Sequence, residues 1–224
     1  MNAAPRFADP LGEDWIILLL VVMFGMLTWI NLASPKKWKL VTASFFTLRL
    51  GKQSMREDVD LQDRTLIGLF IMCSAVISLF IYEVLVLRGM VPSGWLEWAR
   101  IFGIGLVLLL AQFLILRLVG FLFQGDGGTN EYVSTLVLIW IALGLFLLPV
   151  AVLVTVPHHI AWRIALCWIG LIAMAAVILF RWIRALAIGV GEGVSLRYIF
   201  IYICAAEILP FALAAHRARE TILP

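Results

Sequence analysis

The stretch TLIGLFIMCSAVISLFIYEVLVL, residues 65–87, contains a single charged side chain, Glu83. A helix rises about 1.5 Å per residue, so about 20 apolar residues cross a hydrocarbon core of about 30 Å. The apolar residues form a continuous run and do not alternate with polar ones, which excludes a strand of a membrane β-barrel. The stretch therefore predicts a helix that spans a membrane.

Comparable apolar runs lie on both sides of this stretch. The hydrophobic residues make up 63% of the 224 residues and the mean hydropathy is +1.05, whereas a soluble domain is roughly 45 to 50% apolar. We therefore expect an all-α, polytopic integral membrane helix bundle, one membrane domain over residues 1–224, with about six transmembrane helices. The predicted spans are residues 14–34, 65–87, 95–123, 132–156, 160–183 and 196–215.

Residues 35–64 form the one sizeable segment between predicted spans, and they are basic. Lys36, Lys37 and Lys39 lie among apolar residues at near-helical spacing. Such a segment fits a cytoplasmic interfacial helix whose lysines meet anionic lipid headgroups. An ordinary basic loop that sets the topology fits equally well. The charge is local to the membrane surface and indicates no nucleic-acid partner.

The distribution of Lys and Arg predicts the orientation. Eleven of these residues fall on the side that holds residues 35–64, and six fall on the other side. Because cytoplasmic loops carry the excess of positive charge, the first side should face the cytoplasm. This arrangement places both termini on the outer, periplasmic face.

Cysteine and histidine residues give no sign of a metal or redox site. Cys73, Cys167 and Cys204 lie far apart inside apolar runs, as small buried hydrophobic residues do. His158 and His159 are adjacent and have no further ligand at metal-binding spacing. We expect neither a metal nor another cofactor.

Glu207 is the acidic residue that the sequence places deepest in the membrane. It lies about eleven residues into the last predicted span, or roughly 16 Å deep. A charge there costs about 2.5 to 3.5 kcal/mol, so the carboxyl group should face the bundle interior. Pro210 should kink the helix and free the Ala206 carbonyl. The pair is a candidate functional site, and a structural clamp between helices is the alternative.

Gln112 and Arg117 on the third span are the candidate partners of Glu207. Gln112 should lie near the midplane and could bond to the acid, whereas Arg117 lies nearer the cytoplasm and could extend to water or to the acid. Both could equally serve as bundle contacts.

Two further groups of charged residues lie near predicted span ends. Glu83 is five residues before Arg88, which favours a boundary ion pair over a catalytic acid. Arg181, Arg184 and Arg197 could form a cytoplasmic pocket for lipid headgroups, although the topology alone would require such residues.

Two stretches resemble a known family. The first is LRYIFIYICAAEILPFALA, residues 196–214, in which the resemblance lies in Tyr202, Cys204 and Glu207 to Pro210. The second is NEYVSTLVLIWIALGLFLLPVAVL, residues 130–153, in which it lies in Glu131, Tyr132, Gly144, Leu148 and Pro149. In these residues the chain is similar to the Bacteroidota polytopic membrane proteins of the domain of unknown function 4271 family. The resemblance implies an inner-membrane protein of a Gram-negative cell and carries no assigned activity.

Three functions remain open from the sequence. A non-enzymatic subunit or assembly factor of a larger envelope complex, with a membrane-protein partner or a second copy of the chain, fits best because one acid alone lies centrally. A small transporter or channel would use Glu207 as an intramembrane proton-coupling acid. An intramembrane enzyme would need Glu207, Gln112 and Arg117 to converge on one cavity, so the sequence favours a non-enzymatic role.

Overall fold

A computed structural model describes residues 11–33, 64–122, 128–156 and 159–191. These residues form helices and turns and no strand. The helices are α1 (Asp14–Ala33), α4 (Arg64–Leu87), α5 (Trp95–Leu122), α6 (Gly128–Thr155) and α7 (Ile160–Gly191). All five are long and apolar enough to cross a membrane. The predicted helical membrane bundle is thereby confirmed for the described residues, whereas the interfacial segment and the sixth span lie outside them.

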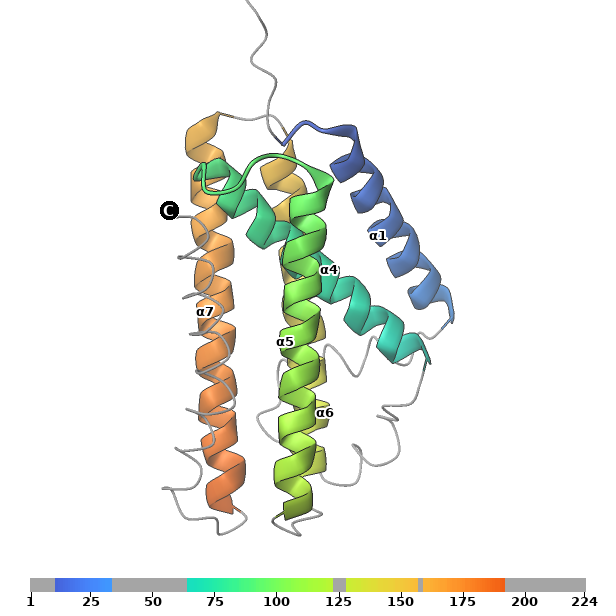
Figure 1. Ribbon diagram of the computed structural model, residues 1–224, viewed down its shortest axis with the longest axis vertical. Helices are drawn as coiled ribbons and strands as arrows, with labels where there is room; N and C mark the ends of the chain where they lie inside the picture. The colour runs from blue at the N-terminus through green and yellow to red at the C-terminus, as the bar shows by residue number, and fades with distance from the viewer. Residues whose placement is uncertain (1–10, 34–63, 123–127, 157–158, 192–224) are drawn as a thin grey trace, which may run out of the picture.

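The helices run up and down between two ends of the bundle. At the upper end of Figure 1, α1, α5 and α7 begin and α4 and α6 finish, and we call this the upper end. Helix α4 crosses the bundle obliquely, while α5, α6 and α7 run roughly along its long axis and α1 diverges beside α4. Four tryptophans lie in the first turns of helices at the upper end, where an interfacial aromatic belt would be expected: Trp15, Trp95, Trp98 and Trp162.

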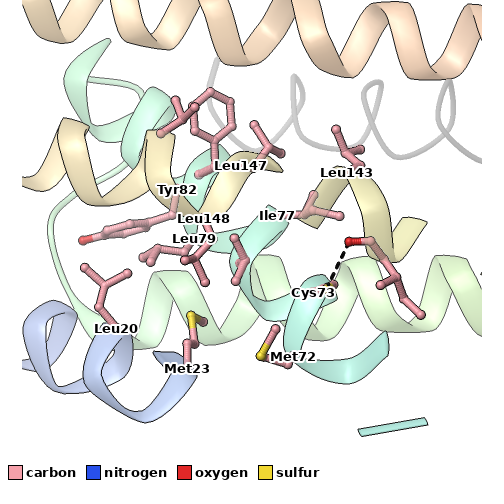
Figure 2. Close-up of a cluster of buried hydrophobic side chains, with 14 of the residues drawn as sticks. Leu20, Met23, Met72, Cys73, Ile77, Leu79, Tyr82, Leu143, Leu147 and Leu148 are labelled. Atoms are coloured by element: carbon pink, nitrogen blue, oxygen red, sulfur yellow. Dashed lines mark hydrogen bonds between the residues drawn. The ribbon is translucent and has the colours of Figure 1, made fainter. Parts of the chain in front are cut away.

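Helices α4 and α6 form the centre of the core. Figure 2 shows Leu20 and Met23 of α1 on one side of α4, with Leu143 and Leu147 of α6 on another. Within lipid the hydrophobic effect does not drive helices together, so close van der Waals packing must hold this centre.

Gly144 allows α4 and α6 to approach each other closely. A Cβ atom added at Gly144 would lie 2.4 Å from Cys73 Cβ and 2.7 Å from Cys73 Cα. The Cys73 thiol donates to the Ile141 carbonyl at 3.3 Å (Figure 2). The backbone of Leu145 also lies close to this thiol. Glycine and cysteine thus act together at one helix crossing.

Helix α7 packs against α4 through a second glycine. A Cβ atom at Gly170 would lie 2.2 Å from the Phe80 ring, which is fully buried. The ring therefore occupies the space that a side chain at this position of α7 would need.

The turn between α4 and α5 closes the upper end. Gly89 has φ of 66°, its N–H bonds to the Val86 carbonyl at 2.9 Å, and the Met90 N–H bonds to the Leu85 carbonyl at 3.0 Å. This pair of bonds is the Schellman motif, in which a left-handed glycine ends a helix. The Gly94 N–H then donates to the Tyr82 hydroxyl at 2.9 Å, which ties the start of α5 to α4.

Two helices extend farther than the predicted spans. Helix α6 begins at Gly128, before the predicted residue 132, and α7 continues to Gly191, past residue 183. Helix α5 ends at Leu122, one residue before the predicted end. The added turns lie at the lower end, where α6 begins and α7 finishes. In α7 these turns follow Arg181 and Arg184 and contain further apolar residues, 185–190.

Candidate functional site

Glu83 is the fully buried acidic residue of the described helices. Its exposed fraction is 0%, and it lies four residues before the end of α4. It continues the helix face that also holds Cys73, Val76 and Phe80, all of which are fully buried, since positions three and four apart share a face. The packing that buries this apolar face therefore buries the carboxyl group as well.

Thr155, the last residue of α6, provides the direct partner of this acid. Its hydroxyl Oγ1 lies 2.7 Å from Glu83 Oε1 and 3.1 Å from the Ala151 carbonyl of its own helix. A hydroxyl group has one hydrogen to donate and can accept as well. The two residues are 72 positions apart in sequence, and the crossing of α4 with α6 brings them together.

Arg163, in the first turn of α7, completes the group. Its Nη2 donates to the Thr155 carbonyl at 3.2 Å and to the Val156 carbonyl at 3.3 Å. These carbonyls end α6 and have no helical donor, so the cation both satisfies them and complements the negative end of the helix dipole. Arg163 is 5% exposed and lies close enough to Glu83 for an electrostatic attraction.

We call Glu83, Thr155 and Arg163 the upper polar cluster. It joins three helices at a point about 6 Å along α4 from its end, at 1.5 Å per residue. Glu83 Oε2 is buried and has no hydrogen-bond partner among the described residues. A buried carboxyl oxygen without a partner is rare and points to a functional role or to an exchanging water molecule or proton.

The predicted ion pair between Glu83 and Arg88 is wrong. Arg88 lies beyond the end of α4, where its guanidinium carbon is 5.7 Å from the centre of the Trp168 ring. The cation is thus held by an aromatic face of α7, and Arg163 supplies the positive charge near the acid. The helical spacing of Glu83 from Phe80 and Cys73 was the sequence signal for its burial, whereas its partners could not be read from spacing along one helix.

The candidate residues of the third span do not share a face. Gln112 is buried, with its amide nitrogen lacking a hydrogen-bond partner among the described residues, whereas Arg117 is exposed. Glu207 and Pro210 lie outside the described residues, so the pairing of Gln112 with Glu207 stays a prediction. The convergence of Glu207, Gln112 and Arg117 on one cavity therefore stays untested.

The structure describes some of the candidate headgroup residues and not others. Arg181 is buried in α7 with an exposed fraction of 8%, and the backbone of Arg184 lies one turn farther along the same helix. Arg117, Arg181 and Arg184 all lie toward the lower end, opposite the upper polar cluster. Lys36, Lys37, Lys39 and Arg197 fall outside the described residues, and the headgroup site stays a prediction.

An aromatic group lies beside the upper polar cluster. The Trp15 ring packs edge-on against Tyr82 at 5.4 Å, and Trp98 lies 6.1 Å from Trp15 and stacks on Phe102 at 5.6 Å. Aromatic pairs at these separations are favourable. They join the first turns of α1 and α5 to the last turn of α4 and so brace the helix that carries Glu83.

Cys73 and Cys167 are buried free thiols, as expected for small hydrophobic residues. In the part of the chain that the structure describes, no three His, Cys, Asp or Glu side chains gather as a metal site would require. The upper polar cluster brings together a carboxyl, a hydroxyl and a guanidinium group, which can form hydrogen bonds and pair charges.

Comparison with known proteins gives one match. Residues 16–216 fit the model of the family described as Domain of unknown function (DUF4271). This match includes all three residues of the upper polar cluster. No curated protein and no solved structure matches the chain.

Proposed function

The chain belongs to the family of the Domain of unknown function (DUF4271), and we propose that it is a non-enzymatic subunit or assembly factor of a larger complex. We place it in the inner membrane of a Gram-negative cell, with both termini on the periplasmic side, because the side with most Lys and Arg should be cytoplasmic.

The outward surface of α7 carries this proposal. Helix α7 has a broad exposed surface. One line of exposed residues along its length, which we call the α7 stripe, includes small side chains. It comprises Ala161, Ala165, Trp168, Ile172, Ala176, Leu179 and Ile183.

Small residues within the α7 stripe favour a helix as its neighbour. Ala161 and Ala165 are one turn apart at the upper end, and Ala176 lies farther along. Pairs of small residues four apart let two membrane helices approach closely enough for backbone contact, which lipid chains do not require. Helix α5 exposes one small residue, Gly103, but its exposed surface continues with the large, branched Val107, Leu110 and Leu114. The α7 stripe carries three small residues, and we therefore favour α7 as the surface for a partner helix.

Photo-crosslinking in native membranes tests the proposal. A photoreactive residue at Ile172 should give a discrete adduct with one protein, and an Ala165→Leu substitution should reduce that adduct several-fold because the added side chain separates the helices. The same photoreactive residue at Leu114 on α5 is the matched control and should react mainly with lipid.

The mass of the adduct distinguishes the partners. An adduct of twice the chain mass identifies a second copy, and another mass identifies a different membrane protein. Equal labelling at Ile172 and Leu114, together with a monomer in native lipid discs, would contradict the proposal.

A small transporter or channel is the second candidate. Glu83 supports it, because ionisable residues inside a membrane commonly serve ion pathways and proton relays. Glu207 remains the coupling acid expected from the sequence. In a proton-flux assay in vesicles, Glu83→Gln or Glu207→Gln should abolish the activity, and full flux in both variants would remove this candidate.

A further inference from the structure

We propose that Glu83 is a proton-binding site, in which Thr155 and the Ala151 carbonyl accommodate both the charged and the neutral carboxyl group with the heavy atoms in the same positions. The proposal is independent of partner binding at α7. It rests on the arrangement of three oxygen atoms and on the burial of the carboxyl group.

The charged form is matched by two neighbours. The Thr155 hydroxyl donates its hydrogen to Glu83 Oε1 across 2.7 Å. Arg163 lies within electrostatic range and supplies the opposite charge. A buried carboxylate needs both a donor and a counter-charge, because burial removes the solvation that water would provide.

In the neutral form, Glu83 and Thr155 can form a hydrogen bond between the same two oxygen atoms, with donor and acceptor exchanged. Once Glu83 carries a proton on Oε1, it becomes a donor and Thr155 Oγ1 becomes the acceptor. The threonine hydrogen then rotates to the Ala151 carbonyl, which lies 3.1 Å away. A hydroxyl group rotates freely about its C–O bond, so the two forms can have their heavy atoms in the same positions.

The second carboxyl oxygen supplies the point of exchange. Glu83 Oε2 is fully buried and has no hydrogen-bond partner among the described residues. It can therefore receive a transient water molecule. A hydronium ion gives its proton to Oε2 and leaves as water, and the net charge of the upper polar cluster rises by one. A half-turn of the carboxyl group then exchanges the two oxygens and brings the proton beside Thr155 Oγ1. The short distance to the end of α4, about 6 Å, makes the upper end the natural entry side.

Few other charges surround the acid. Helix α7 contributes Arg163 and the thiol of Cys167, and helix α6 contributes the neutral Thr155. On α4 itself Arg88 is turned toward Trp168, and the phenol of Tyr82, the residue before Glu83, lies within the field of the acid. Arg163 is therefore the charged neighbour whose field most strongly opposes proton uptake, and Thr155 adjusts the balance through its hydrogen bond.

Infrared difference spectroscopy of the full chain in lipid vesicles tests the site. With glutamate labelled by ¹³C, lowering the pH should produce a protonated carboxyl band that is absent from Glu83→Gln. Thr155→Val removes the hydrogen bond from both forms, and the charged form loses more because a hydrogen bond to a charged group is stronger. The band should therefore appear at a proton concentration about tenfold lower. Thr155→Ser, which keeps the hydroxyl, is the matched control and should titrate like the unmodified chain.

The variants also exclude the alternatives. Circular dichroism verifies folding, and if Glu83→Gln fails to fold, the comparison of Thr155→Val with Thr155→Ser still tests the site with the acid in place. A titrating band that persists in Glu83→Gln and disappears in Glu207→Gln would overturn the proposal. Identical titration of Thr155→Val and Thr155→Ser, or no titrating band in the unmodified chain, would overturn it too.

Discussion

The contact between Gly144 and Cys73 shows how a single atom limits the distance between two helices. A Cβ atom at Gly144 would come within 3 Å of Cys73 Cα, Cβ and Sγ. The Cα atom belongs to the backbone, so rotation of a side chain cannot relieve the overlap. Every close contact of α4 with α6, including that of Glu83 with Thr155, depends on this approach.

Gly144→Ala should therefore destabilise the bundle. Overpacking of a tight core costs typically about 1 to 3 kcal/mol, and thermal unfolding in mild detergent should occur at a lower temperature. Gly103→Ala on α5 is the matched control, because nothing lies within 4 Å of the added Cβ there. The control should unfold at the same temperature or slightly higher, since alanine favours a helix over glycine. Equal effects of the two changes would contradict the close approach.

At the scale of helices, two contacts attach α7 to the rest of the bundle: polar interactions of Arg163 in its first turn, and close packing at Gly170 farther along. Arg163 caps the end of α6 and faces Glu83, and Gly170 receives the Phe80 ring of α4. The two contacts are seven residues apart, or about two turns. They therefore fix both the position of α7 along its axis and its rotation.

The link between Glu83 and Arg163 can be measured by a double-mutant cycle. Arg163→Met alone should destabilise the protein by about 3 to 5 kcal/mol, because it leaves a buried acid without its counter-charge. Combining it with Glu83→Gln should cost less than the two single changes added together, with a coupling energy of about 1 to 3 kcal/mol. Unfolding in a denaturing detergent provides the measurement.

Arg100→Met is the control for the loss of a charge. Arg100 pairs with Glu97 at 2.6 Å on the exposed surface of α5, where such pairs contribute little. Additive effects of Glu83→Gln and Arg163→Met would show that the two groups do not interact.

The contact between Gly170 and Phe80 predicts a compensating pair of substitutions. Gly170→Ala should weaken the bundle because the added methyl group meets the Phe80 ring. Phe80→Leu removes ring atoms and should restore part of the lost stability when it is combined with Gly170→Ala. Thermal unfolding of both single variants and the double variant checks this. A double variant that is as unstable as the sum of the single changes would argue against the contact.

For the whole molecule, the two ends of the bundle differ in chemistry. The upper end holds the polar cluster, the aromatic group and a short turn between α4 and α5, whereas Arg117, Arg181 and Arg184 lie toward the lower end. An excess of positive charge belongs on the cytoplasmic side. The orientation expected from the sequence therefore puts the upper end outside.

Cysteine labelling tests this orientation. In a chain without its three cysteines, Met90→Cys should react with a membrane-impermeant maleimide added to cells with a permeable outer membrane. Met90 is 47% exposed in the turn between α4 and α5, so the reagent can reach it. Asp126→Cys, between α5 and α6 in sequence, is the control and should react only after the inner membrane is opened. The reverse pattern would invert the topology.

The sequence by itself determined the class of fold and the position of the helices along the chain. In lipid every backbone polar group needs a partner within its own segment, so a long apolar run has almost no alternative to a helix. The resemblance to the family could also be read from the sequence, in stretches that include Glu131, Gly144 and Pro149. Helix ends were less predictable, as α7 shows, because apolar residues continue after Arg181 and Arg184 and the helix continues with them to Gly191.

Only the tertiary structure decided which polar groups meet. Glu83 looked like the partner of Arg88, a near neighbour in sequence, yet it bonds to Thr155 and faces Arg163 on two other helices. That outcome depends on the crossing and rotation of α4, α6 and α7, which glycine contacts such as Gly144 with Cys73 determine. Such contacts join residues that are distant along the chain, and apolar patterning along one helix holds no information about them.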